Sequence, residues 1–510
     1  MRLPLTALAL VITIAATSAA AGERPNILIA ISDDQSFAHT SFAGYPAVST
    51  PHFDRVASSG VFFENAIAAS PGCSPSRAAL LTGRHTWQIE EAGTHASSFP
   101  AKYRTFVELL QEAGYTAGHT GKGWGPGNYE LEGRTENPAG PGFHEKRLVP
   151  PTNGINKIDY AGNFEDFLAQ RDPEQPFLFW YGAKEPHRKF EKGSYLAAQK
   201  SLSDATPPSF LPDHPEIRAD LADYCVEIEW FDQHLGKMLA MLEASGELEN
   251  TIVIVTSDNG MAFPRAKANV YEYGVHVPLA IMWNAQIPPN RIVKDVVGFV
   301  DLTATIFDLS GTAPPQGELA LSGASLRELL LSDRQGLTRP DSFAYAARER
   351  HSSSRYNNLS YPQRALRTSR FLYIKNFAPE RWPAGDPVQL DDEGKPLGPH
   401  SGYTDIDRCP SQDLLLAGHD TPGLSKYFHL AVDKRPAEEL YDILNDPGCL
   451  HNLADKETYA ATRRELRAQL EGYLLETGDP RQVDGGDIWE TYPRYSPMRT
   501  FPPHASGSDQ

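Results

Sequence analysis

Apolar runs that stop abruptly at polar residues recur along the first two-thirds of the chain. Residues 25–32 form one such run, which ends at Asp33 and Asp34, and residues 251–260 repeat the pattern. An unbroken apolar run of this length is typical of a strand that is buried on both faces of a parallel sheet. Further strands are predicted at 116–122, 176–183 and 278–283.

Segments with helical periodicity separate these runs. Residues 103–115 have helical spacing and a glycine stop. The longest helical stripe, within residues 221–244, consists of Leu221, Tyr224, Cys225, Ile228, Phe231, Leu235, Met238 and Leu242. This alternation predicts an α/β fold in which a mostly parallel sheet is sandwiched between helices.

The pattern changes from about residue 340. Residues 364–377 have the alternation of paired strands, residues 377–427 are rich in Pro, Gly and Asp, and residues 457–476 have helical spacing. The change predicts a smaller C-terminal α+β domain that carries an antiparallel sheet. We expect a leader over 1–21, a large domain over 22–345 and the C-terminal domain over 346–510.

The N-terminus has the features of a secretory leader. Arg2 supplies a positive charge, residues 3–16 are apolar, and residues 19–21 form a small-residue cleavage site. The apolar stretch is too short to span a bilayer comfortably, which disfavours a membrane anchor. We expect no stable membrane insertion and a periplasmic or secreted mature protein.

The net charge bears on which class of molecule the protein binds. The formal charge is −18, and removal of the leader takes away only Arg2, which gives 46 − 65 = −19. A surplus of acidic residues argues against a nucleic-acid partner, because basic side chains are needed to neutralise phosphates. A small anionic substrate remains possible, since it responds to the local field of a pocket.

Four cysteines are too few for a disulfide scaffold in an exported chain of 510 residues. Cys225 lies in the long helical stripe and is expected to be a buried thiol. Cys409 and Cys449 both fall in the C-terminal third and could pair. Cys73 stands in a turn beside Pro71, Gly72 and Pro75, which suits neither a strand nor a helix interior.

The polar residues at the strand ends predict a metal site. Asp33 and Asp34 follow one predicted strand, and Asp258 and Asn259 follow another. In a parallel sheet, ligands collect at the carboxyl ends of the strands. All four side chains offer oxygen, which suits calcium better than zinc, although either pair alone could be an ordinary turn.

The strongest chemical signal is the stretch CSPSRAALLTGRH, residues 73–85. It resembles the signature of type I sulfatases, members of the alkaline-phosphatase-like superfamily. The resemblance implies that Cys73 is oxidised to formylglycine by a formylglycine-generating enzyme during maturation. Its hydrated aldehyde would be the nucleophile, forming a covalent sulfo-enzyme intermediate and expelling the sulfate as the aldehyde reforms.

The resemblance also implies roles for the metal-site residues. Asp33 and Asp34 in SDDQ match the first metal-binding pair, and Asp258 and Asn259 in SDNG match the second. One Ca²⁺ per chain would be held by these four residues and by the side chain of Cys73.

Four further residues match positions that contact the sulfate or the nucleophile in this family. Arg77 resembles the arginine that holds formylglycine, and Lys122 in HTGKGW resembles a lysine that contacts the sulfate. His187 in EPHRK matches a histidine near the leaving group, and Lys267 matches the second sulfate-binding lysine.

The chain departs from the family pattern in two places. Many relatives have Gly-Lys-x-His after the second strand, whereas this chain has Trp124 in place of the histidine that normally hydrogen-bonds formylglycine. His85 or His119 could substitute. Where relatives often carry Gly-x-Arg-x-Pro, this chain has His276 in place of the arginine.

The resemblance implies a sulfated sugar as substrate. The EPHR tetrapeptide and the loop RWPAGDP look most like bacterial relatives of heparan N-sulfatase (N-sulfoglucosamine sulfohydrolase), so the sulfate could be an O-ester or glucosamine N-sulfate, as in glycosaminoglycans. Two alternatives stay open: a phosphodiester or phosphonate monoester hydrolase of the same superfamily, and an inactive carbohydrate-binding relative. The missing histidine supports the second, and the complete CSPSR motif opposes it.

Overall fold

The computed structural model describes residues 24–391 and 393–496. The predicted leader lies outside the described residues. Within them, no helix has both the length and the apolar character needed to cross a bilayer.

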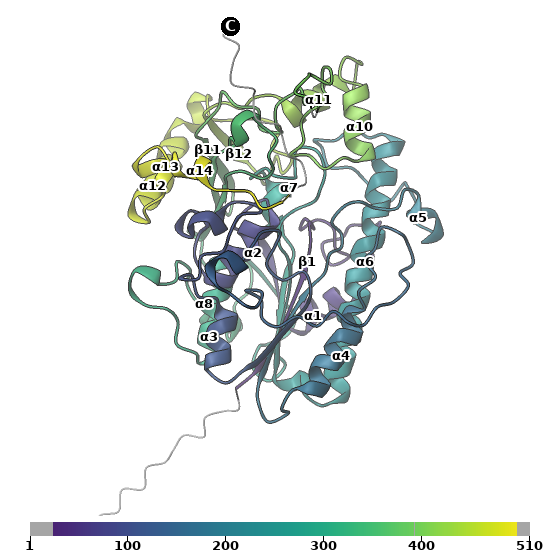
Figure 1. The fold of residues 1–510 in the computed structure, drawn as a ribbon, viewed down its shortest axis with the longest axis vertical. Helices are drawn as coiled ribbons and strands as arrows, with labels where there is room; N and C mark the ends of the chain where they lie inside the picture. Colours follow the sequence, from purple (N-terminus) through teal and green to yellow (C-terminus); the bar gives the residue numbers. More distant parts are fainter. Residues whose placement is uncertain (1–23, 392, 497–510) are drawn as a thin grey trace, which may run out of the picture.

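An eight-stranded sheet forms the centre of the large domain (Figure 1). Its strands are β1 (Asn26–Ser32), β2 (Val61–Ile67), β3 (Thr116–Gly121), β4 (Phe177–Gly182), β5 (Thr251–Ser257), β6 (His276–Val277), β7 (Leu279–Met282) and β8 (Arg291–Gly298). The order is β3-β4-β1-β5-β7-β2-β6, with β8 also paired to β2. The pairs β3–β4, β4–β1, β1–β5 and β2–β8 are parallel.

The remaining pairings make the sheet mixed. β7 runs antiparallel to both β5 and β2, and β6 is antiparallel to β2. Pro278 separates β6 from β7, as expected for a residue that lacks the N–H needed for a ladder hydrogen bond.

Helices cover both faces of the large sheet because the side chains of β1 are apolar in both directions. Ile27, Ile29 and Ile31 belong to one core, and Leu28 and Ala30 belong to the other. Figure 1 shows α2 (Cys73–Thr82), α3 (Phe106–Glu112) and α8 (Phe299–Ser310) on one side of the sheet. The other side carries α1 (Pro51–Ser59), α4 (Tyr160–Gln170) and α6 (Pro215–Ala244).

The C-terminal part contains a smaller antiparallel sheet. Its order is β12-β11-β10-β9, built from β9 (Phe343–Arg348), β10 (Gln363–Thr368), β11 (Phe371–Asn376) and β12 (Glu438–Asp442). Helix α12 (Ala460–Glu476) packs its buried leucines against this sheet. The short helices α10 (Pro410–Ala417) and α11 (Ser425–Val432) lie in the core that also contains the first half of α6. The predicted fold class, a mostly parallel sheet between helices with a smaller antiparallel sheet, is confirmed.

The expectations for the cysteines have different outcomes. Cys225 is fully buried on α6, as its helical stripe predicts. The suggested pairing of Cys409 with Cys449 is wrong, because both are free, buried thiols. Cys409 caps the start of α10, where its sulfur accepts a hydrogen bond from the backbone of Gln412, and Cys449 belongs to the core beneath the smaller sheet.

Candidate active site

The two acidic strand ends meet at the carboxyl edge of the large sheet. β1 and β5 are parallel neighbours in register, with Ser32 opposite Ser257, so the residues that follow them emerge side by side. The backbone N–H of Asp34 donates to Asp258 Oδ1 at 3.2 Å, and Asn259 Nδ2 donates to Asp34 Oδ1 at 2.6 Å. All three side chains are buried.

Oxygen atoms at this edge have the properties of metal ligands. Asp33 Oδ1, Asp34 Oδ2 and Asn259 Oδ1 are buried without a hydrogen-bond partner among the described residues. Ligand atoms of Asp33, Cys73 and Asp258 all lie within 4.8 Å of one another. Buried oxygens without partners are strongly unfavourable unless a cation or a proton satisfies them. The donor set therefore fits a hard, oxygen-binding cation such as calcium.

Two lysines and one arginine reach the same cluster. Lys122 Nζ, from the end of β3, pairs with Asp33 Oδ2, and Lys267 Nζ pairs with Asp34 Oδ1. Burial opposes ionisation of these groups, yet the carboxylates raise the pKa of both lysines above its ordinary value. In return, the pKa of Asp33 and of Asp34 stays below its ordinary value despite burial, chiefly because of the paired lysine. The cluster is thus built from ionised groups of both signs.

Arg77 joins the CSPSR stretch to the acidic edge. It lies one turn into α2, fully buried, and its Nε donates to Asp258 Oδ2 at 2.7 Å. Its Nη1 donates to the backbone carbonyls of Lys122 and Gly123 at 2.7 and 3.2 Å. These contacts orient the first turn of α2, on which Cys73 lies.

Cys73 is the first residue of α2, with Gly72 in extended conformation before it. Its side chain is buried, and its sulfur lies 3.4 Å from Nε2 of His95. Burial raises the pKa of the Cys73 thiol, and the charges of Asp33 and Asp258 act in the same direction against Lys122. An unmodified thiol here is therefore protonated and a weak nucleophile.

His187 approaches the cluster from the loop that follows β4. Its Nδ1 donates to the carbonyl of Arg188 at 2.7 Å, which leaves Nε2 facing Asp34 Oδ2 at 3.8 Å. Burial lowers the pKa of His187, although both nearby aspartates oppose the shift. Arg188 forms two hydrogen bonds to Asp220, which anchors this loop to α6.

The structure thus brings together every residue that the sequence assigned to the site. Around the carboxyl edge of the sheet lie Asp33, Asp34, Cys73, Arg77, Lys122, His187, Asp258, Asn259 and Lys267. They come from the ends of β1, β3, β4 and β5, from the start of α2 and from the loop after β5.

The histidine at the Cys73 sulfur was missed, and the suggested substitutes lie elsewhere. His85 Nε2 contacts the Tyr473 hydroxyl at 3.0 Å and its ring stacks on Trp87, while His119 Nδ1 donates to the carbonyl of Gly140. His95 lies in a short turn with neither helical nor strand periodicity. No local pattern could have indicated its contact with Cys73.

Trp124 occupies the place of the expected family histidine and has a structural role. It is buried, packs edge-on against Phe99, and its indole Nε1 donates to the carbonyl of Ser74 at 3.0 Å. It therefore supports the backbone of the first turn of α2.

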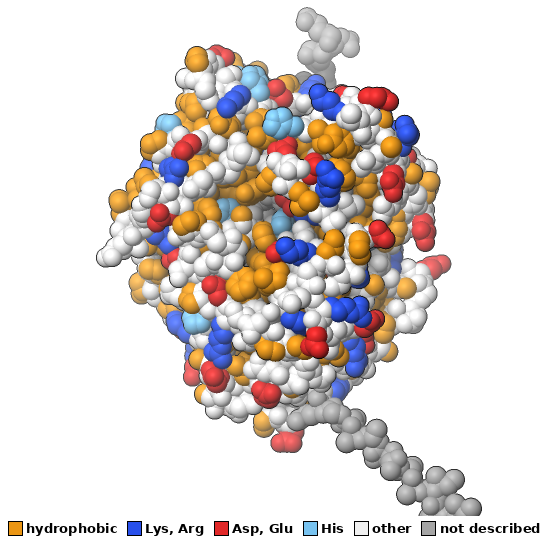
Figure 2. Space-filling view, turned by 180° about the vertical axis from the view of Figure 1, so that it is seen from behind, with side chains coloured by type: hydrophobic (Ala, Val, Ile, Leu, Met, Phe, Trp, Pro, Cys, Tyr) orange, Lys and Arg blue, Asp and Glu red, His pale blue; other side chains and the backbone are white. Residues whose placement is uncertain are grey.

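One face of the molecule is hollowed near its centre, and acidic and histidine side chains are visible in the hollow (Figure 2). Elsewhere on this face, basic, acidic and apolar side chains are interspersed. The described surface in this view carries no broad basic band of the kind that binds a polyanion along its length.

Comparisons with known proteins agree with this geometry. The family profile described as Sulfatase matches residues 25–312. An ulvan-active sulfatase of Formosa agariphila is 26% identical over 504 residues, which cover 91% of this chain and 77% of that protein. Human N-sulphoglucosamine sulphohydrolase is 29% identical over 495 residues, covering 89% of this chain and 91% of the relative.

Solved structures share the fold. A protein in complex with its substrate D-glucosamine-2-N,6-O-disulfate superposes with a TM-score of 0.62 at 20% identity, over 90% of this chain and 99% of that chain. This likeness supports the alkaline-phosphatase-like architecture. Because the Sulfatase profile covers more than half of the sequence, this protein belongs to the type I sulfatase family and is a sulfatase.

Proposed function

We propose that the enzyme removes sulfate from a terminal sulfated sugar, using formylglycine derived from Cys73 and one Ca²⁺. The observation that carries the proposal is the position of Cys73, whose sulfur lies within 4.8 Å of carboxylate oxygens of Asp33 and Asp258. Lys122 and Lys267 are near enough to lower the pKa of the same thiol, against the larger effect of burial. Concentrated positive and metal-binding groups suit a nucleophile that must approach an anionic sulfate.

The modification would replace the buried thiol, which is a weak nucleophile. A formylglycine hydrate at residue 73 supplies a hydroxyl able to attack sulfur. Arg77 holds the first turn of α2 in place and contributes a buried positive charge beside the nucleophile. A formylglycine-generating enzyme is the implied partner during maturation, and the predicted leader would direct the protein to the periplasm or outside the cell.

Asp33, Asp34, Asp258 and Asn259 would hold the calcium ion, together with the side chain of residue 73. When bound, the cation offsets the carboxylate charges and polarises sulfate oxygens. The partnerless oxygens of the cluster support this assignment. A single acidic cluster among the described residues favours one metal, and hence hydrolysis of a sulfate group, over the two-metal chemistry typical of phosphoester hydrolysis.

Three side chains are assigned to the substrate. The ammonium groups of Lys122 and Lys267 border the cluster and are placed to neutralise the transferred sulfate. His187 directs Nε2 toward the same centre, because a backbone carbonyl engages its Nδ1. Because Nδ1 keeps its own proton for that carbonyl, Nε2 can give a proton to the departing oxygen or nitrogen of the sugar only in the doubly protonated ring, which burial disfavours and the charges of Asp34 and Asp33 favour.

The substrate class follows from charge and from the relatives. The human relative is named for N-sulphoglucosamine and the Formosa relative for ulvan, so we propose a sulfated sugar as substrate, with glucosamine N-sulfate first and an O-sulfated sugar second. A net charge of −18 disfavours long contacts with a highly sulfated chain, so we expect action on a terminal unit.

The experiment combines chemistry at residue 73 with a substrate panel. Mass spectrometry of the peptide that contains Cys73 should show the aldehyde in protein co-expressed with a formylglycine-generating enzyme. Sulfate release should then be compared for glucosamine N-sulfate, glucosamine 6-O-sulfate and an intact sulfated polymer. An unmodified Cys73 in active enzyme would refute the formylglycine assignment, and faster release from interior polymer units would refute action on a terminal unit.

Replacement of the nucleophile should have the largest effect on activity. We expect Cys73→Ala to lower sulfate release by at least about a thousandfold, since removal of a covalent nucleophile abolishes that route. The fold should persist, because the side chain contributes little packing. A variant that kept a tenth of the wild-type kcat would contradict the proposal.

A further inference from the structure

His95 lies at the side chain of Cys73 and forms part of the wall of the site. Its Nε2 lies 3.4 Å from the sulfur of Cys73, within hydrogen-bonding range for sulfur. In the modified enzyme, oxygen attached to Cβ of residue 73 would replace that sulfur. The position of His95 is therefore directly relevant to the nucleophile, whereas Trp124, at the expected histidine position, has no proton-accepting atom.

Backbone contacts on both sides hold His95 in place. Its N–H donates to the carbonyl of Arg350 at 3.2 Å, and Thr94 Oγ1 donates to the same carbonyl at 3.0 Å. On the other side, the N–H of Ala96 donates to Ser74 Oγ, inside the nucleophile motif, at 3.1 Å. The turn with His95 is thus tied both to the start of α2 and to the loop after β9.

The ring of His95 is also supported. The ring of His351 lies against it, with centroids 4.6 Å apart. His351 in turn packs against Gly72, where an added Cβ would come within 3.1 Å of His351 Nδ1. Glycine before Cys73 therefore allows the histidine pair to approach the nucleophile closely.

The C-terminal segment 492–496 closes over this turn. The N–H of Tyr495 donates to the carbonyl of Ala96 at 2.6 Å, and Ser97 Oγ donates to the carbonyl of Pro493 at 2.8 Å. Arg350 donates through Nη1 and Nη2 to the carbonyls of Tyr492 and Pro493, at 2.6 and 3.0 Å.

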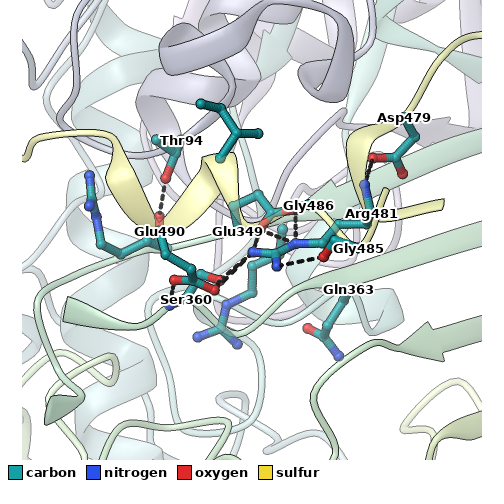
Figure 3. A network of polar contacts seen from close by, with 12 residues as sticks. Thr94, Glu349, Ser360, Gln363, Asp479, Arg481, Gly485, Gly486 and Glu490 are labelled. Carbon is teal, nitrogen blue, oxygen red and sulfur yellow. Dashed lines mark hydrogen bonds and ion pairs between the residues drawn. The ribbon is translucent and has the colours of Figure 1, made fainter. Parts of the chain in front are cut away.

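A buried ionic network anchors that segment to the smaller sheet. Figure 3 shows Arg481, from α13 (Pro480–Val483), between Glu349 and Glu490, which lies in α14 (Ile488–Thr491). Arg481 Nη2 donates to Glu349, to Ser360 Oγ and to Glu490 at 2.8, 2.8 and 3.0 Å. Glu349 precedes Arg350, so the network fixes the loop whose carbonyl holds His95.

We propose that His95 is a catalytic residue that hydrogen-bonds the reacting side chain of residue 73 in place of the missing family histidine, and that segment 492–496 positions it. The inference rests on the proposed formylglycine function. A hydrogen bond from Nε2 to an oxygen on Cβ of residue 73 fixes the orientation of that side chain toward the substrate. The C-terminal segment thereby becomes part of the active site although it lies about four hundred residues from His95 in sequence.

The first test separates the hydrogen bond from the volume of the ring. His95→Phe keeps an aromatic ring against His351 and loses the hydrogen bond, whereas His95→Gln keeps a polar group that can form one. We expect kcat to fall by about a hundredfold in His95→Phe and by about tenfold in His95→Gln, with KM changed less than threefold. Conversion of Cys73, measured by mass spectrometry, should remain at the wild-type level in both.

His85→Phe is the matched control, because His85 is also a buried histidine against an aromatic ring. Its kcat per folded enzyme should stay within about threefold of wild type, as expected for a residue outside the reaction. Equal kcat in His95→Phe and His85→Phe would overturn the proposal. It would also be overturned if the activity of His95→Phe fell only in proportion to a loss of Cys73 conversion. Absent conversion in the wild type would instead refute the proposed function.

The second test addresses the C-terminal segment. Tyr495→Pro removes the N–H that Ala96 O accepts, and Tyr495→Ala keeps it while removing the half-exposed ring. We expect kcat to fall by about tenfold in Tyr495→Pro and by less than about twofold in Tyr495→Ala, without change in KM or conversion. Addition of His95→Phe should make the proline substitution nearly silent. If the kcat of the double variant fell by the product of the two single losses, the segment would not act through His95.

Discussion

Two walls of this active site are built in different ways. The acidic wall, formed by Asp33, Asp34, Asp258 and Asn259, comes from residues that directly follow two adjacent parallel strands. The histidine wall, formed by His95 and His351, comes from turns that the second sheet and the C-terminal segment hold together.

The walls also differ in how fully the side-chain oxygens in and behind them are paired. One oxygen each of Asp33, Asp34 and Asn259 has no hydrogen-bond partner among the described residues, as suits a site that takes up a cation and a sulfate. Behind the histidine wall, Asp405 pairs with Arg348 and Arg355, and Arg364 pairs with Asp479 and Glu349. The contrast indicates that the acidic wall binds ligands, whereas the histidine wall holds its side chains in fixed positions.

The largest expected contrast comes from removing one buried carboxylate from each region. Asp258→Ala removes a proposed calcium ligand and the partner of Arg77, so kcat should fall by more than about a thousandfold. After chelation, added calcium should raise the melting temperature of the wild type. It should leave the melting temperature of Asp258→Ala unchanged. Calorimetry and thermal unfolding with and without calcium measure both effects.

Asp405→Ala is the matched control for that comparison. It also removes a buried carboxylate paired with arginine, but its partners are Arg348 and Arg355 rather than residues of the acidic wall. The variant should lose stability and still bind one calcium ion. Calcium-dependent melting in Asp258→Ala, or its absence in Asp405→Ala, would contradict the division between the two regions.

A smaller effect is expected from the network behind the histidine wall. Arg481→Gln leaves Glu349 and Glu490 with one fewer buried cation, so the free energy of unfolding should fall by about 2–4 kcal/mol. Urea denaturation measures this loss. Calcium affinity should not change, and kcat should fall only moderately as the His95 turn loosens. A loss of calcium affinity would show that the walls are coupled.

The smallest effect concerns acid stability. Burial raises the pKa of Glu490, but hydrogen bonds from Arg381 and from the backbone of Ser360 outweigh it and hold the pKa at about 2. Because the folded pKa lies below the unfolded value near 4.5, Glu490 stabilises the protein above pH 4.5 and loses that contribution as the pH falls toward 2. Glu490→Gln should therefore flatten the melting temperature profile in this interval.

The control for the pH profile is Glu393→Gln, in an exposed ion pair with Lys395. Surface pairs contribute little to stability, so its profile should follow that of the wild type. If Glu490→Gln and the wild type lost melting temperature equally between pH 4.5 and 2, the ionic anchor of α14 would not contribute as described.

Much of the acidic wall was predictable from the sequence. Unbroken apolar runs before Asp33 and Asp258 indicated parallel strands, and parallel neighbours place their carboxyl ends at one edge. The CSPSR stretch pointed to Cys73 and Arg77 through its resemblance to the type I sulfatase signature, which consecutive residues carry. The alternation of strands and helices predicted the sheet and its two layers for the same reason: each signal is carried by consecutive residues.

The histidine wall depended on tertiary structure. His95 and Tyr495 lie in segments without periodicity, and their contacts join parts of the chain separated by hundreds of residues. The suggested roles of His85 and His119 and the suggested pairing of Cys409 with Cys449 were wrong, because sequence order does not state which buried groups become neighbours.

The sequence by itself thus determined the strands, the acidic residues at their ends and the CSPSR motif, since hydrophobic periodicity and short motifs are local properties. Only the tertiary structure decided which histidine lies against Cys73 and which segment contacts the turn of that histidine. That choice depends on how the smaller sheet and the C-terminal segment pack over α2, where buried hydrogen bonds between distant backbone groups must all be satisfied at once.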